Sequence, residues 1–385
     1  MRGLPSDSSL GLYLHIPFCR KKCSYCSFMS VVPQDDLLRR FAACLKREID
    51  LNRDLLSQRK IATVYVGGGT PGVLGERLLD IIRCLSGNFD LSDIVEFTVE
   101  LNPESSPVEL LRGIRKLGVN RVSIGVQSFQ DSLLSTLGRI HTPDMARTAY
   151  SRAREAGFQN VSIDLMAGIP GQNPELLKED LEQAVSLLPE HISYYLLTPE
   201  SMTPLSHAIT SGYAHLPADS LARRMLLHVS KFLKQNDYER YETSNFARPA
   251  FESRHNINYW KRGEYLGLGP SACSHLSGKR WRNNPDLEKY LSSLEDSRVP
   301  MVDEEVLTSR EILTESFMLG LRMKEGIPLE SLRETIPPEK NESLMLLVSS
   351  LSEQGLLSQK GGNLSITEEG LPVSDSIIVE LVSSL

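Results

Sequence analysis

Residues 13–26, with the sequence YLHIPFCRKKCSYC, place three thiols, Cys19, Cys23 and Cys26, on one short loop. The spacing is C-x3-C-x2-C, and the loop directly follows an apolar stretch that predicts a strand. In a four-iron, four-sulfur cluster, each iron that the protein holds needs its own thiolate. Three thiolates would hold three irons and leave the fourth open to a small molecule. The alternative is three unrelated buried cysteines, but half of the chain's 6 cysteines fall in this loop.

The composition is that of an ordinary globular protein. The 385 residues are 41% hydrophobic and 24% charged, which predicts two or three domains. A formal net charge of −7 gives no general attraction to nucleic acid or anionic membranes. We see no signal peptide and no apolar run of membrane-spanning length. The remaining cysteines, Cys44, Cys84 and Cys273, are scattered and are expected in the core, so the sequence predicts a cytoplasmic protein without disulfides.

Predicted strands and helices alternate six times in the first half of the chain. Strands are expected at residues 12–16, 61–66, 96–100, 121–125, 161–166 and 192–197. Helical patterns occupy residues 34–57, 78–85, 107–117 and 143–157, and another begins near residue 174. Six strand-then-helix units predict an α/β fold with a parallel sheet and helices outside it. Both an open doubly wound sheet and a three-quarter (β/α)6 barrel fit this pattern.

Polar residues and glycines stand where these strands end. The turn Gly67-Gly68-Gly69-Thr70-Pro71 follows the second strand, Glu100 ends the third, Gln127 follows the fourth, and Asp164 lies within the fifth. The turn is no P-loop, but its glycines allow a ligand to approach the backbone closely. Glu100 on its own would be a surface acid, whereas Asp164 stands among apolar residues and needs a partner. Because reactive groups gather at the C-terminal ends of parallel strands, we expect one shared site there.

The cysteine loop and its setting resemble the radical S-adenosylmethionine (SAM) superfamily. The resemblance implies a partial barrel and a [4Fe-4S] cluster held by Cys19, Cys23 and Cys26. SAM would bind the open iron through its amino and carboxylate groups, and one electron would split it into methionine and a 5′-deoxyadenosyl radical. Turnover of this kind requires a low-potential electron donor such as flavodoxin.

Further motifs come in the order seen in the oxygen-independent coproporphyrinogen III oxidases of this superfamily. They are GGGTP at 67–71, VELNP at 99–103, GVQSF at 125–129, LGRIH at 137–141, IDLM at 163–166 and GIPGQ at 168–172. By that resemblance, the residues in contact with SAM would be Tyr13, Gly68, Gly69, Thr70, Glu100, Gln127, Arg139 and Asp164. A guanidinium such as that of Arg139 can bind a carboxylate in a bidentate fork. Without the family, Arg139 would be assigned to the surface of a helix.

Two departures from the oxidase pattern favour a sister branch, the HemW-type heme chaperones. The oxidases have a fourth cysteine two residues after the third, where this chain has Phe28. They also carry a long segment before the first strand, whereas this chain reaches Tyr13 almost at once. The resemblance to these chaperones implies that the chain binds heme and hands it to acceptor hemoproteins such as respiratory cytochromes.

The sequence HNINYW at residues 255–260 resembles the segment assigned to heme binding in the chaperone branch. His255 would offer an imidazole as axial ligand of the heme iron, and Tyr259 and Trp260 would offer flat faces to a porphyrin. The alternative is a structural helix with a hydrogen-bonded histidine. The family commonly has a histidine where this chain has Cys273, which would itself be a possible thiolate ligand. The basic residues Arg254, Lys261 and Arg262 could meet the heme propionates.

Three domains are expected: a partial barrel with the cluster loop at 1–215, an α+β extension with the HNINYW segment at 216–304, and a winged-helix-like domain at 305–385. In the last, helices are predicted at 311–323, 328–334, 342–353 and 373–382, with a hairpin at Gly361-Gly362. Such a shape often binds DNA. Residues 301–385, however, hold 15 acidic against 6 basic residues, so we expect no nucleic-acid partner and assign a docking or lid role.

Three functions remain open. The leading hypothesis is a heme chaperone that retains the cluster and SAM. The alternative is the oxidase, in which the radical removes a propionate β-hydrogen, carbon dioxide leaves and a vinyl group forms. A third is a radical methylase or heme-degrading relative that uses a second SAM.

Overall fold

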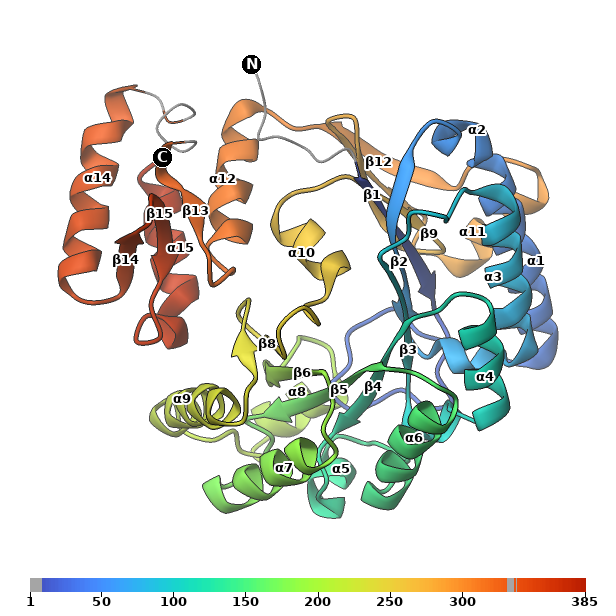
Figure 1. The fold of residues 1–385 in the computed structure, drawn as a ribbon, viewed down its shortest axis with the longest axis horizontal. Coiled ribbons are helices and arrows are strands. Elements are labelled where there is room, and N and C mark those ends of the chain that lie inside the picture. Colours follow the sequence, from blue (N-terminus) through green and yellow to red (C-terminus); the bar gives the residue numbers. More distant parts are fainter. Residues whose placement is uncertain (1–8, 331–335, 337) are drawn as a thin grey trace.

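Six parallel strands in chain order form the centre of the computed structural model, which describes residues 9–330, 336 and 338–385. They are β1 (Ser9–Ile16), β2 (Lys60–Gly68), β3 (Glu96–Leu101), β4 (Arg121–Gln127), β5 (Asn160–Ala167) and β6 (His191–Leu196). In a doubly wound sheet the strand order reverses at one point. Here the order runs from β1 to β6 without reversal, so right-handed crossovers keep the helices on one face. The partial (β/α)6 barrel is confirmed (Figure 1).

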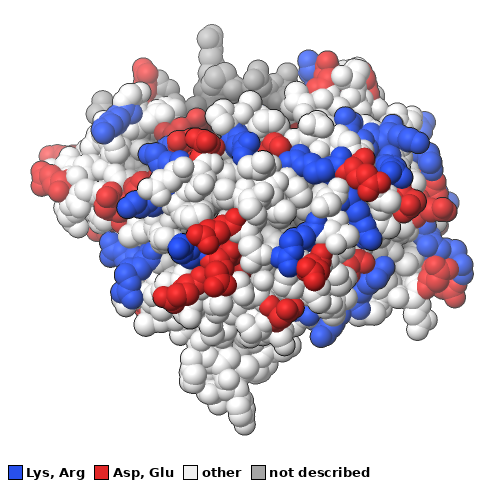
Figure 2. Space-filling model, turned by 60° about the horizontal axis from the view of Figure 1, so that its bottom comes forward, with Lys and Arg blue, Asp and Glu red and all other residues white. Residues whose placement is uncertain are grey.

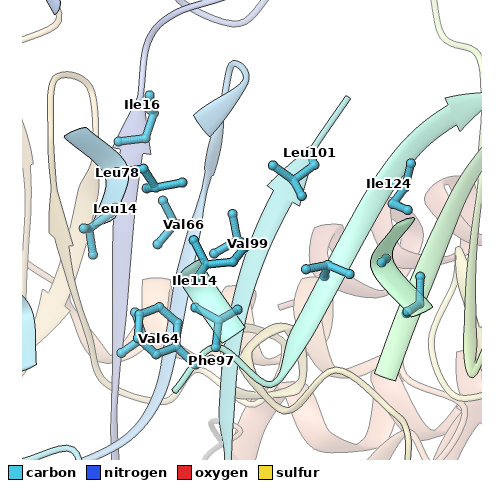
Figure 3. Close-up of a cluster of buried hydrophobic side chains, with 14 of the residues drawn as sticks. Leu14, Ile16, Val64, Val66, Leu78, Phe97, Val99, Leu101, Ile114 and Ile124 are labelled. Carbon is cyan, nitrogen blue, oxygen red and sulfur yellow. The ribbon is translucent and has the colours of Figure 1, made fainter. Parts of the chain in front are cut away.

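The helices of the barrel cover its convex face (Figure 1). They are α1 (Asp35–Leu51), α2 (Arg53–Leu56), α3 (Glu76–Asn88), α4 (Val108–Lys116), α5 (Asp131–Thr136), α6 (Pro143–Glu155) and α7 (Pro174–Ser186), with 3-10 turns at Pro71–Leu74 and Pro103–Ser105. Figure 3 shows the apolar layer between strands and helices, where Val66, Val99 and Ile124 meet Leu78 of α3 and Ile114 of α4. All five side chains are fully buried.

The concave face of the same strands is polar. Side chains alternate between the two faces of a strand. Val64 and Val66 face the apolar layer under the helices, so Thr63 and Tyr65 face the barrel interior. On this inner face the Tyr65 hydroxyl donates to Glu100 at 2.6 Å. This alternation differs from the continuous apolar runs of sheets that are packed on both faces. The barrel interior is therefore built for polar contacts.

Short strands extend the sheet at both edges to twelve strands. Next to β1 lie β9 (Tyr265–Leu268), β10 (Cys273–Leu276), β11 (Lys279–Asn283) and β12 (Met301–Val306), and next to β6 lie β8 (Asn245–Ala247) and β7 (Glu239–Arg240). The helices of this region are α8 (Pro204–Thr210), α9 (Asp219–Gln235), α10 (Arg254–Trp260) and α11 (Leu287–Glu295). Helix α10 lies on the concave side (Figure 1), where the Arg254 backbone N–H donates to Glu96 at 2.6 Å.

The C-terminal module has a hydrophobic core of its own, centred on Phe317, Leu344, Leu364 and Leu381. Its elements are α12 (Ser309–Gly320), β13 (Ile327–Pro328), α14 (Pro338–Glu353), β14 (Leu357–Lys360), β15 (Asn363–Ile366), a 3-10 turn at Leu371–Val373 and α15 (Ser374–Ser383). The predicted hairpin and winged-helix-like shape are confirmed. The helix expected at 328–334 falls largely outside the described residues.

Two surface properties bear on partners. Across the described ranges, no helix combines the length and apolar character needed to cross a membrane. On the face shown in Figure 2, acidic and basic side chains are interspersed rather than gathered into a field of one sign.

Candidate functional site

Backbone hydrogen bonds fix the cysteine loop to the barrel. The N–H of Cys19 donates to the carbonyl of Val31 at 3.1 Å, and that of Ser24 donates to the carbonyl of Leu137 at 3.0 Å. Phe18, just before the first cysteine, is fully buried and meets Phe41 edge-on at 4.9 Å. The three thiols form no disulfide and are partly exposed. The loop thus holds them in place at the C-terminal end of β1.

A chain of hydrogen bonds links two of these thiols through three other segments. The Thr70 hydroxyl donates to the Cys19 sulfur at 3.5 Å and accepts from the Asn102 side-chain amide at 2.8 Å. Arg139 donates through Nη2 to Asn102 Oδ1 at 2.8 Å and through Nη1 to the Cys23 sulfur at 3.5 Å. The segments after β2 and β3 and the loop that carries Arg139 therefore meet at the cysteine loop.

Arg139 does not lie on a helix surface, so that alternative is wrong. It stands between α5 and α6, where its Nη2 also donates to the Gly125 carbonyl at 2.7 Å and its Nε donates to His141 Nδ1 at 3.3 Å. Burial and the charge of Arg139 lower the pKa of His141 to about 4. Neutral His141 then uses Nε2 to donate to the Val126 carbonyl, 3.0 Å away, and accepts at Nδ1.

The glycine turn after β2 packs tightly against the start of the cysteine loop. Gly68 has a φ of +105°, a left-handed conformation that favours glycine. A Cβ on Gly69 would lie 2.6 Å from the carbonyl oxygen of Phe18. The N–H of Thr70 donates to the same carbonyl at 2.7 Å. Larger residues at these two glycines would push the turn away from the thiols.

Two partly exposed carboxyl groups, Glu100 and Asp164, lie on the inner face. Glu100 accepts from the Tyr65 hydroxyl at 2.6 Å and from the Gly68 N–H at 3.1 Å. Burial raises its pKa to about 7. Asp164 accepts from the Ser123 hydroxyl at 2.9 Å, and burial raises its pKa as well. The partner expected for Asp164 is thus a serine of the neighbouring strand.

Tyr13, in β1, and Gln127, the last residue of β4, are the two remaining residues predicted to contact SAM. Gln127 has a φ of +66° beside a bulge in the pairing of β4 with β5. A non-glycine residue in this region is strained, and such strain clusters at functional sites. The hydroxyl of Tyr13 lies 2.9 Å from His15 Nδ1, and its ring centroid lies 6.3 Å from that of Tyr65.

His255 is fully buried, and both of its ring nitrogens have partners. Nδ1 lies 2.8 Å from the Thr63 hydroxyl and Nε2 lies 2.9 Å from the Tyr259 hydroxyl. Its ring stacks on Tyr65 at 5.1 Å. Burial and the charge of Arg121 lower its pKa to about 3, so the imidazole is neutral. In this conformation His255 is the hydrogen-bonded histidine of a structural helix, and neither nitrogen is free for iron.

The other residues proposed near the heme segment are a cysteine and three basic residues. Cys273 is exposed, so the expectation of a core cysteine is wrong for this residue. The three basic residues each meet an acid: Arg254 meets Glu252 at 3.6 Å, Lys261 meets Glu325 at 2.9 Å, and Arg262 meets Glu315 at 3.0 Å.

Asn102 and Tyr65 are site residues that sequence reasoning did not single out. Asn102 belongs to the VELNP motif, in which only Glu100 is predicted to contact SAM. Asn102 directly follows β3, at the edge of the sheet where the strands end, and this position is the signal that indicates a site residue. Tyr65 alternates with Val64 and Val66, so strand periodicity places it on the inner face.

The three thiols, with Thr70 and Arg139 beside two of them and Glu100 bound to the glycine turn, fit a thiolate-bound cluster with an amino acid ligand beside it. Burial raises the pKa of the Cys19 and Cys26 thiols, which are therefore protonated until a metal competes for the sulfur. Hydroxyl and guanidinium donors already face two sulfurs. Glu100 can take an ammonium group. Four of the five N–H donors of Arg139 already have partners, which leaves one N–H on Nη1 for a carboxylate.

Comparison with known proteins shows the family to which the chain belongs. The model of the Radical SAM superfamily matches residues 13–184, and that of the HemN C-terminal domain matches residues 307–373. The chain is 32% identical to the heme chaperone HemW of Lactococcus lactis subsp. lactis (strain IL1403) over 95% of both proteins. It is 33% identical to the heme chaperone HemW of Bacillus subtilis (strain 168), over 97% of this chain and 99% of that protein.

A solved structure shares the whole architecture. Coproporphyrinogen III oxidase (HemN) from Escherichia coli, described as a radical SAM enzyme, superposes with a TM-score of 0.85 over 98% of this chain and 91% of its own. The two are 23% identical, so this likeness concerns the fold.

Proposed function

This chain belongs to the HemW family of radical SAM proteins, and on that premise we propose that it is a heme chaperone that holds a [4Fe-4S] cluster and SAM. Its acceptors would be hemoproteins such as respiratory cytochromes. The observation that carries the proposal is the similarity to two heme chaperones over nearly the full length of each. A local feature supports it: where the oxidases have a fourth cysteine, Phe28 has 65% of its surface exposed.

Cys19, Cys23 and Cys26 would each hold one iron, and the open iron would bind SAM. When bound, the cluster supplies the electron that cleaves SAM, delivered by a low-potential donor such as flavodoxin. The carboxylate of Glu100 would pair with the amino group of SAM, and Arg139 would face its carboxylate. Tyr13, Gly68, Gly69, Thr70, Gln127 and Asp164 would complete the contacts. Arg139 and Thr70 would also donate hydrogen bonds to cluster-bound sulfurs.

Heme would bind at the segment that forms α10, with Tyr259 and Trp260 against the porphyrin. For His255 to reach the iron, Tyr259 must first release Nε2 and α10 must move. We propose the barrel, extension and C-terminal domain at 1–215, 216–304 and 305–385 as the working units of this chaperone, the last serving as docking element or lid.

Heme titration in parallel with an oxidase assay tests the proposal. Full-length protein, reconstituted with iron and sulfide without oxygen, is titrated with heme and incubated with coproporphyrinogen III, SAM and a reductant. We expect saturable heme binding with a Soret band and no vinyl product. Vinyl product without saturable heme binding would overturn the chaperone proposal and favour the oxidase.

SAM affinity should depend on pH through Glu100. Its pKa of about 7 leaves it largely neutral at pH 6 and ionised at pH 8. Because only the carboxylate attracts an ammonium group, we expect SAM to bind roughly tenfold more weakly at pH 6 than at pH 8. Glu100→Gln should weaken binding at pH 8 and remove the pH dependence, measured by equilibrium dialysis of reconstituted protein. The exposed Glu109→Gln serves as control, and a Glu100→Gln variant with the wild-type pH profile would contradict the assignment.

A further inference from the structure

A pocket of about 330 Å3 lies where α10 meets the first residues after α12. Three aromatic residues line it, Tyr195, Tyr259 and Trp260, together with the polar residues Glu242, Asn245 and Arg322. Aromatic walls with a few polar groups are typical of small-molecule sites. The volume is at the small end of such sites, so the pocket suits one edge of a large flat ligand.

Two of the residues that line this pocket each carry a buried side-chain atom with no hydrogen-bond partner among the described residues. The two atoms are the side-chain oxygen of Asn245, a residue only 4% exposed, and the indole Nε1 of Trp260. Buried polar atoms are rarely left unpaired, and each such case needs an explanation. Of the two, the indole N–H of Trp260 is a donor that a carboxylate on a ligand can satisfy.

Arg322 is fixed at this pocket by its backbone. Its carbonyl accepts from the Thr243 hydroxyl at 3.2 Å, and the neighbouring Met323 pairs with Glu242 in an antiparallel bridge. Its guanidinium donates through Nη2 to Asp375 at 2.8 Å, and the Asp375 side chain is 78% exposed. A surface pair of this kind is weak, and one such bond leaves most of the five N–H donors free.

Resting on the proposed function, we propose that this pocket receives a propionate-bearing edge of heme, with Arg322 as the partner of the propionate carboxylate. The ring edge would lie against Tyr195 and Trp260. Burial raises the pKa of Glu242 to about 7, so near neutral pH part of its population is uncharged and can donate to the same carboxylate. Because Arg322 belongs to residues 305–385, heme bound here would join the C-terminal module to the barrel.

Heme and its dimethyl ester, in which both propionates are masked, test the proposal on reconstituted full-length protein. We expect wild type to bind heme about tenfold more tightly than the ester, since a charge-assisted carboxylate–guanidinium contact is lost. Arg322→Gln should weaken heme binding by a similar factor and leave ester binding unchanged. Asp375→Asn, which removes the surface pair without touching the pocket, should bind heme at least as tightly as wild type.

The outcomes separate this inference from the proposed function. If wild type fails to bind heme, the proposed function falls. If wild type binds heme and ester equally, or Arg322→Gln binds heme as tightly as wild type, the inference falls and the proposed function stands. Arg310→Gln, an exposed arginine of α12, controls for loss of one positive charge from the module.

Discussion

Replacing any one of Cys19, Cys23 and Cys26 by alanine is expected to abolish the charge-transfer absorbance of a reconstituted [4Fe-4S] cluster. Each thiolate would hold a different iron, so the two that remain cannot retain the four-iron form. The loop is fixed by backbone hydrogen bonds, such as that from Ser24 to Leu137, which these substitutions leave intact. The variants should therefore keep the wild-type far-ultraviolet circular dichroism while losing iron, sulfide and visible absorbance together.

Cys84→Ala is the matched control, because its partly exposed thiol lies near the carbonyl of Lys46 at 3.8 Å, on the helical layer and away from the loop. It should retain the full iron content. A Cys19, Cys23 or Cys26 variant with four irons per chain and an unchanged spectrum would show that the ligand assignment is wrong.

The strands and helices of the barrel could be predicted from the sequence because their apolar patterns are local. The order of the strands could not, since pairing of β1 with both β2 and β9 joins residues about 50 and 250 positions apart, which local patterns do not encode. The family resemblance selected the barrel, and both the barrel and the HemW family are confirmed. The polar inner face was missed because each strand was classified by its apolar residues alone.

For the site, the sequence predicted where groups gather but not how they connect. Thr70, Asn102 and Arg139 each follow a different strand, and only the parallel register brings them within hydrogen-bond distance. Distances of this kind depend on side-chain conformations that spacing does not encode. The same holds for His255, whose partner Thr63 comes from β2, 192 residues earlier.

Arg121 is a buried arginine at the start of β4. It is 2% exposed, and its Nε has no partner in the part of the protein that is described. Burial lowers the pKa of Arg121, but acidic neighbours, Glu96 foremost, raise it, and the net value is above the usual one. Its charge in turn adds to burial in keeping His191 and His255 neutral. One buried cation therefore reinforces the neutral state of two inner histidines, for which burial is the larger cause.

Arg121→Met should destabilise the barrel by about 3–5 kcal/mol, the usual cost of leaving a buried charge without its partner. The only tryptophans, Trp260 and Trp281, lie outside the C-terminal module, so their fluorescence in urea follows the barrel and its extension. Because Glu96 would be the uncompensated group, adding Glu96→Gln should recover part of the loss, and the two changes should not be additive. Arg112→Met, in an exposed ion pair, should cost less than about 1 kcal/mol. If Arg121→Met costs as little as this control, Arg121 does not hold the interior together.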